Sequence, residues 1–326
     1  MELLEIENLS VVFDTEVGQA KAVADLSVKV KNGKVLGIVG ESGCGKSVTS
    51  LSILRLIPPP GRVVSGRILF KGEDLLTFPE EKMRTIRGNR IGLIPQDPMT
   101  SLNPVYTIGQ QIVEAIELHQ KVDRKEARSR AVEVLERVRI PQASTRLDDY
   151  PHQFSGGMRQ RAMIAMALSC NPELLIADEP TTALDVTVQA QILDLLREIQ
   201  RERGMSIVLI THDLGVVAEM CDEVSVMYAG SVVEHAEVVE LFEKPRMPYT
   251  MGLLNSVPRP GIDRLESIDG QPPSLINLPD ACRFAPRCPL VEDKCLQGVP
   301  PLEEKRNQHF ARCVVIPSEL AAPAVE

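Results

Sequence analysis

Apolar positions near the start of the chain either alternate with polar ones or run unbroken, and both patterns are typical of strands. The segment LLEIENLSVVF alternates, and residues 26–30 and 35–39 are rich in β-branched side chains. The run KVLGIVG is apolar up to its last glycine, which indicates a strand buried on both faces. The pattern then becomes helical over residues 47–56, and the three prolines at 58–60 are expected to end that helix.

Helical periodicity dominates the middle of the chain, over residues 108–119, 125–138 and 156–170. This predicts a helical insert at about 88–172. Strand-like and helix-like segments alternate afterwards, which favours an α/β fold with a largely parallel core sheet covered on both faces. The alternating segments are strand 174–177, helix 188–203, strand 206–210, a short helix near 216–220, and strands 224–228 and 231–234 around the Ala229-Gly230 turn.

The pattern changes again near residue 257, where glycine and proline accumulate. Within about sixteen residues the chain carries Pro258, Pro260, Gly261, Gly270, Pro272 and Pro273. We interpret this stretch as a linker. It divides a first domain at 1–257 from a small extension at 258–326, which is rich in proline and cysteine and has little periodicity.

Composition narrows the possible functions of the 326 residues. Hydrophobic residues make up 44%, enough for a real core, whereas aromatic residues make up only 3% and tryptophan is absent, which argues against a stacking surface for sugars or single-stranded nucleic acid. The net charge of −9 argues against duplex binding. The N-terminus lacks the apolar segment of a signal peptide, and no apolar run approaches the roughly 20 residues of a membrane span, so any membrane role is expected to be peripheral.

A glycine-rich loop follows the apolar strand. Residues 40–47 read GESGCGKS, which matches G-x4-G-K-[ST] between a strand and a helix. Its glycines let backbone N–H groups point at phosphate oxygens, and the helix N-terminus adds positive charge. Lys46 supplies a cation for the β- and γ-phosphates, and Ser47 a hydroxyl ligand for Mg²⁺. The loop therefore predicts a nucleotide site, with a chance glycine-rich turn as the alternative.

An apolar strand ending in two acids, LLIADEP, occupies residues 174–180. A buried strand rarely carries carboxylates without a function. Asp178 is suited to hold Mg²⁺, and Glu179 to orient or deprotonate an attacking water. Acids at strand ends also cap helices, so the pair becomes informative only together with the phosphate loop.

The predicted helix at 156–170 opens with Phe154-Ser155-Gly156-Gly157-Met158. Ser155 stands at the N-cap position, and the two glycines leave bare N–H groups for an anion. In isolation, the segment is better explained as an ordinary capped helix than as an anion site.

The ordered set of motifs resembles the ABC ATPase family over residues 1 to about 257. It comprises the phosphate loop, Gln96 in IPQDP, FSGGM, IADE, Ala183-Leu184-Asp185, and His212 in ITHD. The resemblance implies a P-loop NTPase fold with a mostly parallel core sheet, an N-terminal antiparallel β part and a helical insert. It also implies ATP and Mg²⁺ as ligands.

Roles follow from the resemblance at the matching positions. Phe13 is expected to face adenine, and Glu179, His212, Lys46 and Gln96 to act in catalysis. Positions expected to contact ATP, its magnesium or the γ-phosphate held by a partner ATPase are Gly40, Ser42, Gly43, Cys44, Gly45, Lys46, Ser47, Val48, Gln96, Ser155, Gly156, Gly157, Met158, Asp178 and Asp185. Among these, the implied magnesium ligands are Ser47, Gln96 and Asp178. The usual signature is LSGGQ, so Phe154 and Met158 depart from it, and Cys44 occupies a variable position where we expect a bystander thiol.

Four of the seven cysteines cluster late, as Cys282, Cys288, Cys295 and Cys313. From the spacing C-x5-C-x6-C-x17-C, a metal site and reduced free thiols both remain open. The segments QDPMTSLNPVYTIGQQI, YPHQFSGGMRQR and GQPPSLINLPDACRFAPRCPLVEDKC are similar to the ATPase subunits of dipeptide and oligopeptide ABC importers. That resemblance implies a [4Fe–4S] cluster on the four cysteines, with Zn²⁺ as the alternative.

The same resemblance implies the motor of a peptide importer at the cytoplasmic face of the inner membrane. Its expected partners are a second, related ATPase in a heterodimer, two membrane permeases and an external peptide-binding protein, with no nucleic acid. The alternatives are an importer of nickel or another small solute, and a soluble ABC ATPase of DNA repair or translation. A regulator that binds ATP without cycling is disfavoured by the intact Glu179 and His212.

Overall fold

The computed structural model describes residues 2–97, 101–182, 184–257, 268–306 and 308–315. These residues divide into two compact units. We call residues 31–34 and 77–209 the helix-rich unit, and residues 2–30, 35–76 and those from 210 onward the strand-rich unit. Among the described residues, no helix combines the length and the apolar character that crossing a bilayer requires.

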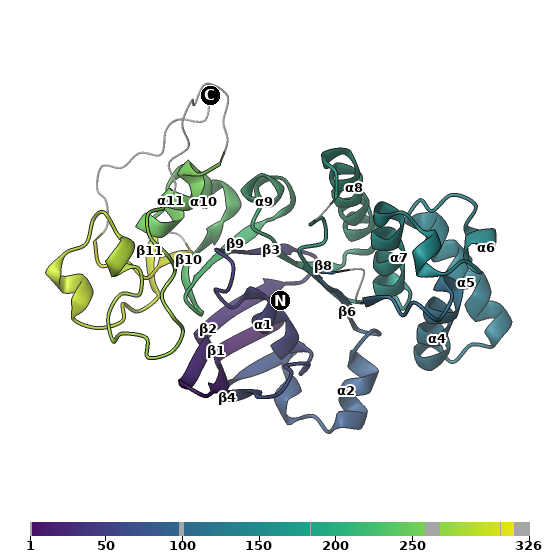
Figure 1. Cartoon of the computed structure of the whole chain (residues 1–326), viewed down its shortest axis with the longest axis horizontal. Helices are drawn as coiled ribbons and strands as arrows, with labels where there is room; N and C mark the ends of the chain where they lie inside the picture. Colours follow the sequence, from purple (N-terminus) through teal and green to yellow (C-terminus); the bar gives the residue numbers. More distant parts are fainter. Residues whose placement is uncertain (1, 98–100, 183, 258–267, 307, 316–326) are drawn as a thin grey trace. The chain divides into compact units, whose positions relative to one another are not determined.

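The helix-rich unit contains three neighbouring strands and most of the helices (Figure 1). Its strands are β6 (Ile91–Ile94), β7 (Leu174–Asp178) and β8 (Ser206–Ile210), whose last residue is assigned to the other unit. Its helices are α2 (Glu80–Ile86), α4 (Ile108–Gln120), α5 (Arg124–Arg137), α6 (Ala143–Arg146), α7 (Gly156–Leu168) and α8 (Val186–Arg203), with a 3₁₀ turn at Pro151–Gln153.

Polar residues cap these helices where the chain enters them. Thr107 forms a reciprocal capping box with Gln110 at the start of α4, and Asp123 caps α5. Such caps satisfy backbone N–H groups that have no partner inside the helix. Helix α7 is buried around almost its whole circumference, among α4, α5 and β6 (Figure 1). Its first turn is therefore held on a rigid support.

The strand-rich unit has an antiparallel sheet in the order β2-β1-β4-β5 and a second group of strands in the order β11-β12-β10-β9-β3. The strands are β1 (Glu2–Thr15), β2 (Gly18–Lys31), β3 (Val35–Val39), β4 (Gly61–Phe70), β5 (Glu73–Asp74), β9 (Glu223–Tyr228), β10 (Ser231–Glu237), β11 (Glu303–Arg306) and β12 (His309–Ala311). The helices are α1 (Lys46–Ile53), α9 (Leu214–Met220), α10 (Val238–Glu243) and α11 (Pro248–Asn255), with 3₁₀ turns at Leu75–Thr77, Ala285–Arg287 and Asp293–Leu296.

Aromatic packing joins the residues after 267 to the rest of the strand-rich unit. Tyr228 of β9, Tyr249 of α11 and Phe284 are all buried, with ring centroids 4.6 to 5.4 Å apart. Such pairs add about 0.5–1.5 kcal/mol each beyond their buried area. Strand β12 also pairs antiparallel with β10, opposing Ala311 to Glu234. The predicted extension therefore packs on, and hydrogen-bonds to, strands that precede residue 257.

Most of the predicted elements are confirmed within one to three residues at each end. The helix expected at 47–56 ends at Ile53, because Arg55 adopts a left-handed φ of 54° and Leu56 N–H bonds to Leu51 O, a Schellman-type ending. The sequence pattern gave no prediction for β4, β5, α2 and β6. Ala183 and residues 98–100, together with Pro258, Pro260 and Gly261 of the predicted linker, lie outside the described residues, and the domain boundary near 257 stays a prediction.

Candidate functional site

The phosphate-type loop, residues 40–47, has a backbone that only glycine accommodates at two positions. Gly40 and Gly45 have φ values of 150° and 107°. A Cβ at Gly40 would lie 2.2 Å from Met227 O, and one at Gly45 would lie 2.3 Å from Ala22 O. Both distances are far below van der Waals contact, so side chains are excluded on steric and conformational grounds.

Lys46 begins helix α1 and is buried, with 7% of its surface exposed. Its Nζ donates to Gly40 O at 2.7 Å and to Glu41 O at 3.1 Å, which folds the loop around the ammonium group. Within the described chain, no side chain caps α1 at Gly45. The first N–H groups of α1, which include those of Ser47 and Val48, are thus available to an anion.

Cys44 lies in the same loop and is buried. Burial raises the pKa of the Cys44 thiol, although the Lys46 ammonium partly opposes the effect. A raised pKa keeps the thiol protonated and poorly nucleophilic near neutral pH. The role of Cys44 as a bystander stays a prediction.

Phe13 is half-buried near the end of β1, opposite Gly61 of β4. A Cβ built at Gly61 would lie 2.5 Å from the Phe13 ring. The glycine therefore makes room for the ring, which keeps one part exposed.

The helix-rich unit brings together two predicted residues, Gln96 and Glu179. Gln96 Nε2 donates to Glu179 Oε2 at 3.1 Å, and the Thr182 hydroxyl donates to the same oxygen at 2.9 Å. Glu179 has a left-handed φ of 47°, which is uncommon for a residue with a side chain and is often found at functional sites. Two donors therefore fix the carboxylate on a strained backbone.

Asp178 ends β7 and is only 5% exposed. A later predicted acid, Asp185, is exposed and caps α8 by accepting from Val188 N–H at 2.9 Å. Asp178 therefore has the buried placement that a metal-binding carboxylate favours, whereas Asp185 has at least a structural task.

Ser155 is the N-cap of α7 and accepts from Met158 N–H at 3.3 Å. Gly156 is exposed, and a Cβ built there meets no atom of the described residues within 4 Å. A Cβ at Gly157 would lie 3.0 Å from Val188. The exposed first turn of α7 thus presents backbone N–H groups beside open space, as an anion site requires.

His212 is exposed and follows β8 in the strand-rich unit. The next residue, Asp213, caps α9 by accepting from Gly215 N–H at 2.8 Å and Val216 N–H at 3.2 Å. Sequence analysis singled out His212 and missed this cap, although an aspartate before an apolar helix is a known start signal.

Other contributors also escaped sequence analysis. Gln160 of α7 donates to Pro180 O at 2.5 Å, which ties α7 to the segment that follows Glu179. The Thr182 hydroxyl donates to the Glu179 carboxylate, and the Tyr249 hydroxyl accepts from Glu41 N–H. No local pattern reports such contacts, since the partners are distant in the sequence.

The four late cysteines all line one small cavity of about 10 Å³ in the strand-rich unit. Cys282 N–H donates to Cys295 O at 2.9 Å, and the other lining residues include Met247 and Leu290. Burial raises the pKa of Cys313 to about 11, and the charges of the other three cysteines act in the same direction. Folding therefore brings the four cysteines together around one cavity, which their spacing in the sequence could not establish.

The predicted [4Fe–4S] cluster, or its alternative Zn²⁺, is nevertheless not shown at these cysteines. Across the described residues, no three or more His, Cys, Asp or Glu side chains are arranged to hold a metal ion. The cavity is about the size one water molecule needs. The thiols must separate before any larger group enters.

Comparisons with known proteins show which families this chain resembles. A family model described as ABC transporter matches residues 23–182, and one described as oligopeptide/dipeptide transporter, C-terminal region, matches residues 233–295. The dipeptide transport ATP-binding protein DppD of Bacillus subtilis (strain 168) is 51% identical over 315 residues, covering 96% of this chain and 94% of that protein. DppD of Escherichia coli (strain K12) is 50% identical over 315 residues, covering 96% of each.

A solved structure is also similar. It is the dimeric post-hydrolysis state of the ATP-binding cassette MJ0796 bound to ADP and Pi, which matches with a TM-score of 0.66 at 25% identity. The match covers 72% of this chain and 98% of that chain. The part of this chain without a counterpart there amounts to about a quarter of its length.

Proposed function

This chain belongs to the ABC transporter family of ATP-binding proteins, and we propose that it is the ATP-hydrolysing motor of an importer for dipeptides or oligopeptides. The predicted fold class, an α/β ABC ATPase, is confirmed by the likeness to MJ0796. One observation carries the choice of cargo. The match to dipeptide transport subunits extends over 96% of the chain and includes the C-terminal region typical of oligopeptide and dipeptide transporters.

In this proposal, residues 40–48 wrap the phosphates of ATP. The constrained glycine backbone and the free N-terminus of α1 support the assignment. The Lys46 ammonium exchanges loop carbonyls for the β- and γ-phosphates, and Ser47 and the buried Asp178 bind Mg²⁺ directly or through water. The half-buried ring of Phe13 packs on adenine.

Hydrolysis rests on Glu179 as the group that orients or deprotonates the attacking water. Its oxygen is already oriented by Gln96 and Thr182, so little reorganisation is needed. Gln96 also contributes to the magnesium site, and the exposed His212 contacts the γ-phosphate. These roles are the ones that the matching positions have in the ABC ATPase family.

The signature turn, Ser155 to Met158, serves the ATP bound by a second ATPase subunit, and Asp185 lies at the same interface. Exposure of Ser155 and Gly156 supports an intermolecular partner. Purified chain is therefore expected to bind ATP but to hydrolyse it poorly until a signature arrives from another subunit. Brisk turnover that does not depend on protein concentration would contradict this division of labour.

Membrane permeases are the proposed docking partners, in a complex bound peripherally to the cytoplasmic face of the inner membrane. On the helix-rich unit, α4 and α5 line a depression of about 230 Å³ that includes Tyr106 and Val113. The exposed apolar side chains of Val105, Tyr106 and Leu118 lie in or next to α4. Apolar surface of this kind marks interaction sites. A related second ATPase and an external peptide-binding protein complete the proposed assembly.

The ATPase assignment is tested by Glu179→Gln, which keeps the shape of the side chain but removes the base. We expect hydrolysis by the assembled complex to fall by about 10²–10⁴-fold while Mg·ATP binding is retained. Glu198→Gln is the matched control, since Glu198 of α8 forms an exposed ion pair with Arg139, which follows α5. Equal turnover of Glu179→Gln and this control would refute the assignment.

The cargo is tested by uptake in cells that lack this chain. Loss of labelled dipeptide uptake, restored by the wild-type chain and not by Glu179→Gln, is the expected result. Loss of nickel uptake with intact peptide uptake would instead support the nickel alternative.

We also propose that Cys282, Cys288, Cys295 and Cys313 hold a [4Fe–4S] cluster. Four thiols around one small apolar cavity are a suitable donor set, despite the small space between them. A cluster would supply metal–thiolate bonds that tie together a segment with little core of its own. Anaerobically purified protein should show a broad visible absorption and about four irons per chain. A colourless protein with stoichiometric zinc would overturn the cluster in favour of zinc.

A further inference from the structure

Arg287, next to Cys288, reaches the phosphate loop. Its two terminal nitrogens donate to the two carboxylate oxygens of Glu41 at 2.7 and 2.9 Å. The arginine side chain is only 5% exposed, whereas that of Glu41 is 27% exposed. A two-bond arginine–carboxylate contact fixes orientation as well as distance. Glu41 is the second residue of GESGCGKS, so the contact acts directly on the loop.

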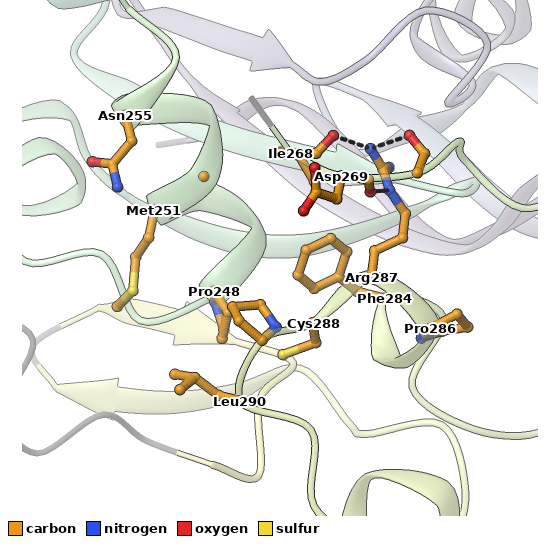
Figure 2. Close-up of a pocket in the computed structure, with 13 residues that line it drawn as sticks. Pro248, Met251, Asn255, Ile268, Asp269, Phe284, Pro286, Arg287, Cys288 and Leu290 are labelled. Carbon is orange, nitrogen blue, oxygen red and sulfur yellow. Dashed lines mark hydrogen bonds between the residues drawn. The ribbon is translucent and has the colours of Figure 1, made fainter. Parts of the chain in front are cut away.

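The guanidinium of Arg287 is itself held rigidly. Its Nε donates to Asp269 O at 2.9 Å, and further contacts reach Gly270 O and the Tyr228 hydroxyl, each at 3.3 Å. Figure 2 shows the group beside Phe284 at the edge of a cavity of about 730 Å³. The position of the Arg287 guanidinium is therefore set by these contacts as well as by its contact with Glu41.

Glu41 is fixed from its backbone as well. Its N–H donates to the Tyr249 hydroxyl at 2.9 Å, and its carbonyl oxygen accepts from Lys46 Nζ at 3.1 Å. The carboxylate, the N–H and the carbonyl of one residue thus all have partners. The Glu41 carbonyl is thus one of the acceptors that hold the lysine proposed to bind phosphate.

A second arginine beside a cysteine supports the far end of the loop. Arg283 follows Cys282 and donates to Ala229 O at 2.6 Å and to the Ser231 hydroxyl at 2.7 Å. The turn between these residues contributes Gly230 N–H, which bonds to Cys44 O at 3.0 Å. The cysteine-bearing segment therefore contacts the loop directly through Arg287 and indirectly through Arg283.

We propose that Arg287 is a positioning residue through which the C-terminal cysteine-bearing segment sets the affinity of the phosphate loop for Mg·ATP. The proposal rests on the proposed ATP site at residues 40–48. Binding is tighter when a loop is held in its bound shape beforehand, because less ordering remains to be done on association. Loss of the Arg287–Glu41 contact removes one of these constraints, and neither of the two side chains is among those proposed to contact nucleotide.

The test is the equilibrium binding of Mg·ATP to the purified full chain, measured together with the melting temperature. Arg287→Ala is expected to weaken binding about tenfold, as the loss of one charge-assisted contact predicts. Arg287→Lys should weaken it less, because lysine keeps the charge but not the paired geometry. Arg306→Ala, on the exposed end of β11, is the matched control and should bind within about twofold of wild type.

Glu41→Gln provides an independent arm that keeps side-chain size and decides the matter if Arg287→Ala does not fold. This variant should weaken Mg·ATP binding by a similar factor. The double variant should bind Mg·ATP as well as Arg287→Ala does, because both substitutions remove the same contact. Wild-type affinity in Arg287→Ala or Glu41→Gln, with only a lowered melting temperature, would overturn the inference. Failure of the wild-type chain to bind Mg·ATP would instead contradict the proposed nucleotide site.

Discussion

Gln96 and Glu179 meet beyond the ends of two neighbouring parallel strands, with Gln96 Nε2 3.1 Å from Glu179 Oε2. Strands β6 and β7 pair in a register that sets Ile94 beside Ala177. Continued two residues past this last pair, the same register sets residue 96 beside residue 179. The hydrogen bond is thus a consequence of strand pairing, and it links a proposed magnesium ligand to the proposed catalytic carboxylate.

We predict that Gln96→Ala lowers the turnover number of ATP hydrolysis about tenfold at saturating Mg·ATP, because the Glu179 carboxylate loses one of the donors that orient it. Thr182→Val removes another of these donors at similar side-chain volume and should lower turnover in the same direction. The two variants can be compared in steady-state assays of the assembled complex. Wild-type turnover in Gln96→Ala would show that the contact has no catalytic consequence.

Gly45→Ala should destabilise the chain severely. The substitution places a Cβ 2.3 Å from Ala22 O at a φ of 107°. Strain from backbone conformation and from overpacking adds up to about 3–4 kcal/mol of lost unfolding free energy. Chemical denaturation measures the change.

The matched comparison for stability is Gly43→Ala. Gly43 also has a positive φ, 78°, but a Cβ there meets no described atom within 4 Å. Only the conformational cost of about 1–2 kcal/mol applies. Equal destabilisation by the two variants would mean that the close approach to Ala22 is relieved at little cost.

His309→Ala should loosen the C-terminal strands. His309 and Glu234 are fully buried, and His309 Nε2 lies 2.6 Å from Glu234 Oε1. Removal of the imidazole leaves a buried carboxylate with one partner fewer, at a cost of about 3 kcal/mol. Asp148→Asn, which breaks the exposed pair with Arg128, should cost under about 1 kcal/mol. Similar losses in the two variants would contradict this difference between buried and exposed pairs.

Alkaline pH should destabilise the folded chain through Cys221. Burial raises the pKa of the Cys221 thiol from 9.0 to about 12, with the nearby Asp222 charge acting in the same direction. The folded state thus favours the protonated thiol. Its contribution to stability is complete below pH 9 and is lost as the pH rises towards 12.

The expected slope is a loss of up to about 1.4 kcal/mol of unfolding free energy per pH unit in that window. Cys221→Ala removes the titrating thiol and with it this part of the slope, so the difference in unfolding free energy between wild type and variant should change as the pH rises from 9 to 11. Parallel pH profiles of the variant and the wild type between pH 9 and 11 would show that the thiol does not titrate as proposed.

The sequence by itself predicted most of the strands and helices and pointed to the residues that are proposed to carry the chemistry. Apolar runs such as KVLGIVG and LLIAD are long enough to specify buried strands, and polar caps such as Ser155 begin helices where the pattern predicts them. These features depend on a few neighbouring residues, so local chemistry suffices. The glycines of GESGCGKS are also local signals, although only the structure shows that Met227 O and Ala22 O demand them.

Tertiary structure alone decided which distant residues meet. The register of β6 against β7 sets Gln96 on Glu179, and nothing in either segment specifies that register by itself. In the same way, folding brings Cys282 and Cys313 to one cavity and Arg287 to Glu41, across 246 positions of sequence. Contacts of this kind depend on how whole elements pack, because each partner is compatible with many others until the surrounding core fixes its position.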